Sequence, residues 1–193
     1  MRVPVVLALV AFSCVGIATA QSPVAHELGA GVLRFAVPAS WRVVTKNEDP
    51  KRSTLLFDVP VSAAGKVKGN VVVTVFRGLG NGDLRSTTAP FVAALISGPV
   101  IGDTLLAGPD RRFLFWQGHR DGVPYAITDD FGWQDGTLVH ISLALPLGKD
   151  VPQAWMQAFS DGTRLLLGSA RLNGALVFPG WAAHPSLSYW STP

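Results

Sequence analysis

Three strand-like runs follow one another between residues 110 and 147, and short turns separate them. The runs are Asp110–His119, Val123–Gln134 and Thr137–Leu147, with Arg120-Asp121-Gly122 and Asp135-Gly136 between them. Asp-Gly supplies the positive φ angles that a tight hairpin turn needs. In the third run four apolar residues (Val139, Ile141, Leu143 and Leu145) alternate with His140 and Ser142. The segment therefore predicts an antiparallel meander with one face on a core.

The remaining elements surround this meander. Strands are predicted at Gly31–Val37, with a continuation over Trp41–Val44, at Thr54–Val59, and at the nearly continuous valine run Asn70–Phe76, which should be central. One helix is predicted with Thr87 or Thr88 as its cap, Pro90 in its first turn and Gly98-Pro99 at its end. A second is predicted after a cap at Asp150, with Asp161-Gly162 as a candidate break. The order predicts an α+β fold in which helices cover an antiparallel sheet.

The N-terminal segment accounts for part of the apolar excess of the chain. Arg2 precedes the apolar run Val3–Phe12, and Ala18-Thr19-Ala20 stands before Gln21. A positive start, an apolar centre and small residues at the end are typical of a secretory signal, here removed after Ala20. A transmembrane anchor is the alternative, but it needs about 20 strongly apolar residues. We expect a periplasmic or secreted protein that starts at Gln21.

The single cysteine, Cys14, lies inside the predicted signal. The mature chain then holds no disulfide, no thiolate metal site and no cysteine nucleophile. The alternative is a lipoprotein acylated on Cys14, but Phe12 fits lipoprotein processing poorly. Membrane anchoring is therefore not expected after cleavage.

Composition limits the class of partner. Of the 193 residues 48% are hydrophobic and 15% charged, and the formal net charge is +3. A chain this apolar can bury enough surface to fold, which excludes a disordered protein. No run of Lys and Arg is longer than the pairs Lys51-Arg52 and Arg111-Arg112, which argues against a nucleic-acid partner.

The segment Phe35-Ala36-Val37-Pro38-Ala39-Ser40-Trp41 resembles the opening of the PsbP/DcrB-like family. Asn70–Phe76 and Leu165–Ala170 match the family's valine-rich strand and closing helix. The resemblance implies an α/β/α sandwich over residues 31–172, after a signal at 1–20 and an extended segment at 21–30. Residues 173–193 would be a strand and an aromatic tail. It also implies work without catalysis, with no active-site residue to carry over.

Candidate catalytic and metal-binding groups are few. The mature histidines (His26, His119, His140 and His184) have no metal-ligand spacing, so neither a metal nor another cofactor is expected. Outward side chains of neighbouring meander strands could bring His119, Asp129, Asp130 and His140 together as a general acid/base group. The favoured interpretation of Asp129-Asp130 is a solvated strand face or a bulge. Ser160 and Ser169 lack the Gly-x-Ser-x-Gly elbow of hydrolases.

Six tryptophans complete the inventory. Trp41, Trp116 and Trp155 are expected in the core. Four aromatic residues near turns or in the tail form the predicted partner-binding surface: Trp133, Trp181, Tyr189 and Trp190. We expect a cofactor-free, non-catalytic protein that binds another envelope or secreted protein as an accessory, chaperone-like or inhibitor-type partner. The alternatives are a glycan- or cell-wall-binding module and a small acid/base hydrolase.

Overall fold

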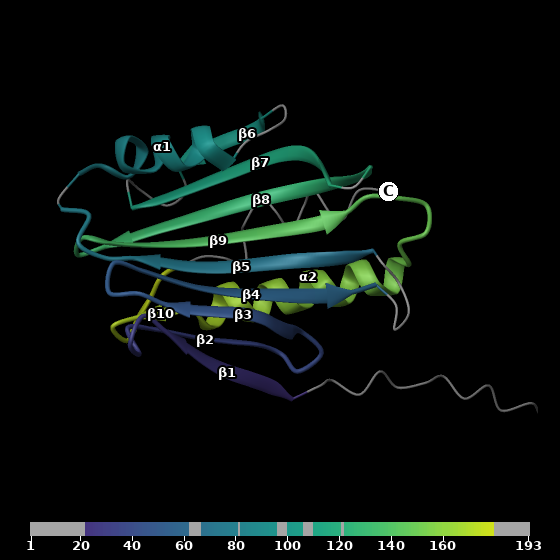
Figure 1. Cartoon of the computed structure of the whole chain (residues 1–193), viewed down its shortest axis with the longest axis horizontal. Coiled ribbons are helices and arrows are strands. Elements are labelled where there is room, and N and C mark those ends of the chain that lie inside the picture. The colour runs from purple at the N-terminus through teal and green to yellow at the C-terminus, as the bar shows by residue number, and fades with distance from the viewer. Residues whose placement is uncertain are drawn as a thin grey trace, which may run out of the picture.

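A large antiparallel sheet organises the molecule (Figure 1). The computed structural model describes residues 22–61, 67–80, 82–95, 100–105, 110–120 and 122–179. Within them the sheet has seven strands in the order β3-β4-β5-β9-β8-β7-β6. These are β3 (Arg42–Glu48), β4 (Arg52–Pro60), β5 (Lys68–Phe76), β6 (Val100–Leu105), β7 (Arg111–Arg120), β8 (Val123–Gln134) and β9 (Thr137–Pro146). The valine-rich strand β5 is central, as predicted.

The predicted meander is confirmed by β7, β8 and β9, which pair in sequence order. Asp135 and Gly136 adopt φ angles of 48° and 71°, so the β8–β9 turn uses the positive φ values that the Asp-Gly pair supplies. The register of β8 continues without a break through Asp129 and Asp130 on both sides. A bulge at these two residues was therefore the wrong expectation.

A smaller sheet lies beside the large one. Its described strands run in the order β1-β2-β10-β11, where β1 is Pro23–Leu28, β2 Leu33–Pro38, β10 Arg171–Leu172 and β11 Ala175–Leu176. The N-terminal segment thus forms a strand that pairs with β2, and the chain that follows the last helix returns to pair with β2 on its other side.

Helix α2 (Gln153–Ser169) closes the main core over one face of the large sheet, which we call the inner face. Residues of three sources meet there: β5 and β9 of the sheet, β2 of the small sheet, and α2. The completely buried sheet residues are Val71, Val73, Val75, Val139, Ile141 and Leu143, and α2 contributes Phe159, Leu166 and Leu167. Continuous burial on this face explains why these positions are all aliphatic or aromatic.

Trp41 fixes the opening of the domain against α2. It is only 6% exposed and its ring lies 6.0 Å from that of Phe57 and 5.9 Å from that of Phe159. The helix does not break at Gly162, in contrast to the candidate break in the sequence. A Cβ on Gly162 would lie 2.6 Å from Cζ2 of Trp41, so glycine is needed there for close packing rather than for flexibility.

The start of α2 differs from the prediction. The residue before the helix is Pro152, in an extended conformation, and no side chain caps the helix. Asp150 was predicted as the cap, but it lies two residues too early. Proline fits this place because it has no backbone N–H group that would need a hydrogen-bond partner.

Helix α1 (Leu84–Leu95) covers part of the opposite face, which we call the outer face. It begins before the predicted caps Thr87 and Thr88, because Asp83 accepts a hydrogen bond from the backbone N–H of Ser86 at 2.9 Å. Pro90 consequently lies inside the helix and not in its first turn. The predicted end at Gly98-Pro99 lies outside the described residues.

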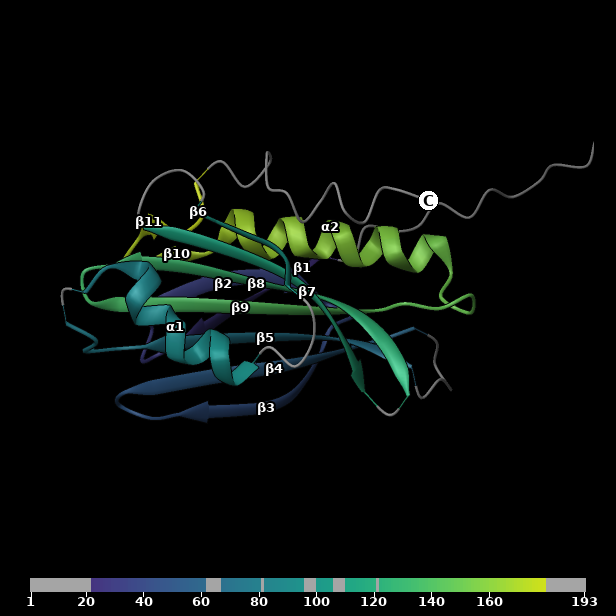
Figure 2. The ribbon, with the colours of Figure 1, turned by 90° about the horizontal axis from the view of Figure 1, so that it is seen from above.

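The two helices lie on opposite sides of the large sheet, and Figure 2 shows α2 along one side and α1 on the other. The α+β class and the α/β/α layering predicted from the sequence are confirmed by this arrangement. None of the helices in the described part of the chain combines the length and apolarity that a membrane crossing requires.

Candidate binding face

The outer face of the large sheet carries a different set of residues from the inner face. Strand pairing places its side chains in rows that cross β4, β5, β9, β8 and β7. The three central rows are Thr54-Thr74-His140-Phe131-Arg112, Leu56-Val72-Ser142-Asp129-Leu114, and Asp58-Asn70-Ala144-Ile127-Trp116. Polar and apolar side chains therefore alternate across a face that only α1 covers among the described helices.

A buried polar cluster lies within these rows. Asp129 is 1% and His140 5% exposed, and Nε2 of His140 lies 2.8 Å from Oδ1 of Asp129. Nε1–H of Trp116 donates to Oδ2 of Asp129 at 2.7 Å, and the Ser142 side chain also hydrogen-bonds to this carboxylate. The His140 ring stacks on Phe131 with centroids 4.6 Å apart. The favoured expectation of a solvated strand face was thus wrong for Asp129.

The electrostatics of the cluster keep Asp129 charged. Burial alone would raise the pKa of its carboxyl, but the hydrogen bonds from His140, Trp116 and Ser142 outweigh burial and lower the pKa. Donors engage both carboxylate oxygens, and a general base needs a free oxygen within reach of a substrate proton. The arrangement therefore stabilises the sheet face more readily than it performs proton transfer.

The other members of the candidate acid/base group lie elsewhere. Asp130 is on the inner face, opposite Phe113 and Ile141. His119 is exposed and pairs with Pro124, five residues along β7 from Leu114, the residue opposite Asp129. Of the four predicted residues the fold brings only Asp129 and His140 together.

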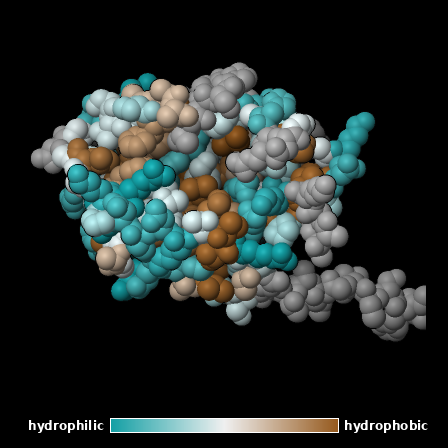
Figure 3. All heavy atoms as spheres, viewed as in Figure 1, coloured by the Kyte–Doolittle hydropathy of each residue, from teal (hydrophilic) through white to brown (hydrophobic). Residues whose placement is uncertain are grey.

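An apolar band crosses the middle of the outer face. We define it as Leu56, Val72, Ala144 and Ile127, which are all part-exposed and neighbour one another across β4, β5, β9 and β8. Figure 3, which has the viewpoint of Figure 1, shows apolar atoms in a band between hydrophilic regions. At the sheet edge Val43 and Val44 are 50% and 51% exposed. The band gives this face accessible apolar surface.

Hydrogen-bonded polar side chains border the β4–β5 half of the band, Leu56 and Val72, on both sides. The hydroxyl oxygens of Thr54 and Thr74 lie 3.3 Å apart on one side. On the other, Asn70 Nδ2–H donates to Asp58 Oδ1 at 2.7 Å, and Lys68 pairs with the same carboxylate. These cross-strand contacts hold the border residues in place.

The sequence did not single out the band, because the valine run of β5 was interpreted only as a central strand. The available signal was the position of Leu56 and Val72, whose side chains alternate with the inner-face residues Leu55, Phe57, Val71 and Val73. Alternation assigns them to the second face, where burial depends on what covers that face.

The predicted partner-binding aromatics are only partly described. Trp133 is half-buried on β8 and packs on the cluster formed by Leu84, Leu114, Phe131 and Leu138. Trp181, Tyr189 and Trp190 lie outside the described residues, as do Cys14 and the predicted signal. Their surface stays a prediction. Trp116 is buried as expected, and Trp155 is part-buried against the core, with its indole N–H donating to the Pro60 carbonyl at 2.9 Å.

No group of three or more His, Cys, Asp or Glu side chains that could hold a metal ion occurs among residues 22–179 where these are described. The Asp129–His140 pair is the closest approach to one on the outer face, and its other neighbours are Trp116, Ser142 and Phe131.

Comparisons with known proteins give similarity of structure without similarity of sequence. No protein-family model and no curated protein matches the chain. Cyanobacterial PsbP from Synechocystis is similar with 15% identity, a TM-score of 0.48, and coverage of 83% of this chain and 97% of that one. LpqN of Mycobacterium tuberculosis, described as involved in cell envelope biogenesis, is similar with 13% identity, a TM-score of 0.45, and coverage of 78% and 90%.

A protein from Bacteroides thetaiotaomicron is also similar, with 12% identity and a TM-score of 0.46 over 79% of this chain. The chain spans about half the length of that protein, 48%. These likenesses concern the arrangement of helices and strands, and they include a PsbP, the family that the Val37-Pro38 opening resembles. Function is argued below from this chain's own residues.

Proposed function

We propose that this chain is a non-catalytic binding protein that acts through protein–protein contact outside the cytoplasm. Its partner is another envelope or secreted protein, and the apolar band of the outer face is the centre of the contact. The observation that carries the proposal is the part-exposed apolar band in the middle of a well-paired sheet, formed by two adjacent cross-strand pairs, Leu56–Val72 and Ala144–Ile127.

The composition of the outer face supports this role. Protein interfaces combine an apolar centre with a polar rim. The band supplies the centre, and the Thr54–Thr74 and Asp58–Asn70–Lys68 contacts supply a rim that is already ordered. A pre-organised surface loses little conformational freedom on binding, which favours affinity.

The same face argues against acid/base catalysis as the main function. The Asp129 carboxylate is buried and receives hydrogen bonds from His140, Trp116 and Ser142. A catalytic carboxylate would need to exchange one of these donors for a substrate group. The role that fits the geometry is structural: the Asp129 carboxylate accepts hydrogen bonds from the buried donors beside the apolar band.

The extracytoplasmic location rests on the N-terminal segment Arg2–Ala20 and its small residues Ala18 and Ala20. The exported protein is expected to begin at Gln21. Intact mass of the exported chain measures this directly. A chain that begins at Cys14 with added acyl mass would contradict it and attach the protein to the membrane.

Conservative variants test the contact surface. Val72→Thr places a hydroxyl on the band without changing side-chain shape, and Val43→Thr makes the same change at the exposed sheet edge. Ile127→Thr replaces an ethyl group of the band by a hydroxyl. Each protein is immobilised and used to capture partners from envelope extract, and the captured proteins are identified by mass spectrometry. We expect the band variants to lose a partner that the wild-type protein and Val43→Thr both retain. Identical capture by all four proteins would contradict the proposal.

A second set of variants separates the band from the predicted aromatic surface. The double change Trp181→Ala and Trp190→Ala removes two of the aromatic residues proposed to contribute to the contact. If these residues are part of one surface with the band, the double variant loses the same partner. Loss of partner capture together with a lowered melting temperature would instead assign these residues to the core.

A further inference from the structure

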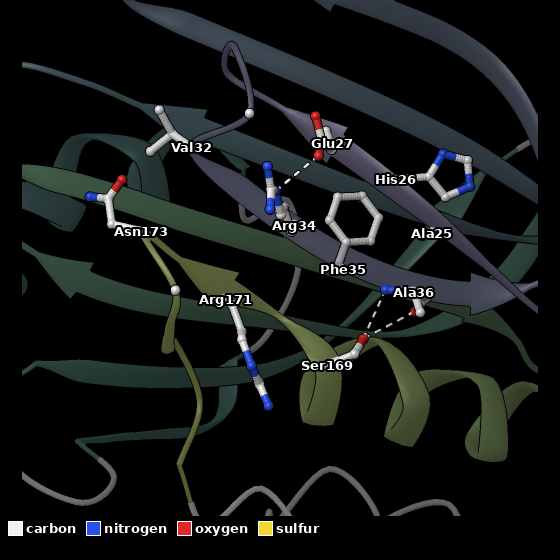
Figure 4. A pocket seen from close by; sticks show the side chains of 12 residues that line it. Ala25, His26, Glu27, Val32, Arg34, Phe35, Ala36, Ser169, Arg171 and Asn173 are labelled. Carbon is white, nitrogen blue, oxygen red and sulfur yellow. Dashed lines mark hydrogen bonds and ion pairs between the residues drawn. The ribbon is translucent and has the colours of Figure 1, made fainter.

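An open hollow of about 550 Å³ lies over the small sheet, on the side of the domain formed by β1, β2 and β10 (Figure 4). Its charged and polar lining comes from His26, Glu27, Arg34, Ser169, Arg171 and Asn173. No residue of the apolar band lines the hollow, because the band lies on β4, β5, β9 and β8 of the other sheet. It is therefore independent of the protein contact proposed above.

Strand pairing brings two arginines together at this hollow. Glu27 pairs with Arg34 across β1 and β2, and Arg34 pairs with Arg171 across β2 and β10, so the three side chains form one row. Like charges directly opposite each other on neighbouring strands destabilise a sheet. The two side chains avoid this repulsion by extending in different directions (Figure 4), so an anion can bind beside each guanidinium group.

The guanidinium groups are largely free to bind. Arg34 donates from Nε to Oε1 of Glu27 at 2.9 Å and is 71% exposed. Among the residues that the structure describes, Arg171 has neither an ion pair nor a hydrogen bond through its side chain. In Figure 4 the Arg34 side chain reaches toward Glu27, while that of Arg171 extends from β10 in a different direction. The two cations therefore border the hollow at separate places.

Two turns linked by a backbone hydrogen bond frame the arginines. Gly29, Ala30 and Gly31 all have positive φ angles in the β1–β2 turn, and Asn173 and Gly174 have φ angles of 50° and 89° in the β10–β11 turn. The Asn173 N–H donates to the Val32 carbonyl at 2.9 Å, which links the two turns. These backbone conformations hold the walls in one arrangement.

Small residues form the floor of the hollow, and a backbone N–H group there has a hydrogen-bond partner. Ala25 and Ala36 pair across β1 and β2, and the backbone N–H of Ala36 donates to Oγ of Ser169 at 2.8 Å. Methyl groups at these positions leave room for the body of a ligand above the sheet.

The charge of the hollow follows from its titratable groups. Burial and the nearby Lys46 lower the pKa of His26, so this imidazole is neutral at pH 7. Two arginines against Glu27 then leave the hollow with a charge of +1.

We infer that this hollow binds a small organic molecule that carries two oxyanion groups, one for each arginine. Planar guanidinium groups bind carboxylates and phosphates through paired hydrogen bonds, which favours these groups over a halide. The volume of about 550 Å³ exceeds the needs of a single inorganic ion and lies in the range of small-molecule sites. The uncharged middle of the ligand would lie over Ala25 and Ala36.

Titration calorimetry of the exported protein at low salt tests the inference with defined probes. Citrate supplies several carboxylates and fructose 1,6-bisphosphate supplies two phosphates, while acetate and inorganic phosphate supply one group each. We expect at least one of the larger probes to bind about tenfold or more tightly than the matching single-group probe. Binding of only citrate or only the bisphosphate identifies which oxyanion the hollow takes.

Matched variants locate the site. Arg171→Gln and Arg34→Gln should each weaken the tighter probe by at least about tenfold, as loss of a charged hydrogen bond predicts. Arg42→Gln is the control, because Arg42 is an exposed arginine on β3 of the other sheet and removes the same charge. Amide shifts in the wild-type NMR spectrum should fall on residues 31–36 and 171–174.

Three results would overturn the inference. The first is the absence of heat and shift changes with both larger probes at millimolar concentration. The second is equal weakening by Arg42→Gln and Arg171→Gln, which would show a general charge effect. The third is a set of amide shifts centred outside residues 31–36 and 171–174, which needs no variant to measure.

Discussion

The two faces of the large sheet are formed by the same strands but differ in how deeply their side chains are buried. On the inner face Val71, Val73 and Val75 are completely buried against α2 and the small sheet. On the outer face their neighbour Val72 is part-exposed, and Thr74 lies beside the buried polar cluster of Asp129 and His140. A single strand thus provides a sealed core on one side and a surface available for contact on the other.

Under the proposed function, this difference separates stability from recognition within one sheet. The inner face gains its stability from apolar area removed from water and from close packing. On the outer face, polar side chains that hydrogen-bond to one another lie beside the part-exposed apolar band. Changes on the inner face should therefore affect the free energy of unfolding, whereas changes to the band should affect partner binding.

The largest effect is expected at Trp41, where the inner core meets α2. Trp41→Ala removes a ring that packs on Phe57 and Phe159 and should lower the free energy of unfolding by about 3–5 kcal/mol. Urea unfolding followed by circular dichroism measures the loss. A shift no larger than that of an ordinary surface change would show that the inner core does not depend on this contact.

The next largest effect is expected at the polar cluster of the outer face. In Asp129→Asn an amide NH₂ group replaces one acceptor oxygen, so either His140 or Trp116 loses its partner inside the sheet. We expect a loss of about 2–3 kcal/mol in the free energy of unfolding. Asp161→Asn, at an exposed pair with Arg164 on α2, is the control and should change it by less than about 1 kcal/mol. Equal effects of the two variants would refute a structural role for the cluster.

A direct comparison of the faces uses two adjacent valines. Val73→Thr buries a hydroxyl in the inner core and should cost about 1–3 kcal/mol in the free energy of unfolding. Val72→Thr makes the same change on the part-exposed band and should cost about 0.5 kcal/mol or less. Urea denaturation of both proteins under the same conditions gives the two values. Similar costs would mean that the outer face is as tightly packed as the inner one.

The smallest effect is a difference in acid sensitivity. Because the pKa of Asp129 is lower in the folded chain than in the unfolded one, its contribution to stability is complete above the unfolded pKa, about 4. That contribution is lost as the pH falls through the folded pKa. The wild-type protein should therefore lose stability more steeply below pH 4 than Asp129→Asn, as measured by melting temperature at several pH values. Parallel pH profiles would contradict the lowered pKa.

Local patterns in the sequence predicted much of the fold. The Asp135-Gly136 turn and the alternation in β9 depend on neighbouring residues, so the meander could be inferred without tertiary information. The start of α1 was missed because Asp83 competes with Thr87 and Thr88 as a cap, and only the Ser86 hydrogen bond distinguishes them. Gly162 was misinterpreted as a break because its close neighbour Trp41 is far away in the sequence.

The sites were less predictable than the fold because they depend on contacts between distant strands. The hydrogen bond between Asp129 and His140 follows from the β8–β9 pairing, and the sequence indicated it only as a candidate. The burial of Asp129 depends on Trp116 and on the covering layer, which no local pattern encodes. The opposition of Arg34 and Arg171 requires β10 to return to β2, across more than a hundred residues.

The bond between Ala36 and Ser169 has a consequence for how the chain reaches its final structure. It joins residues 133 positions apart, and β10 also depends on β2 as its partner. Contacts of such high sequence separation form late, because the entropy of closing a long loop must be met first. During synthesis β2 can pair with β1 at once, but its contacts with α2 and β10 form only after residue 172 has been made. The N-terminal half of the domain therefore completes its fold only when the C-terminal helix is available.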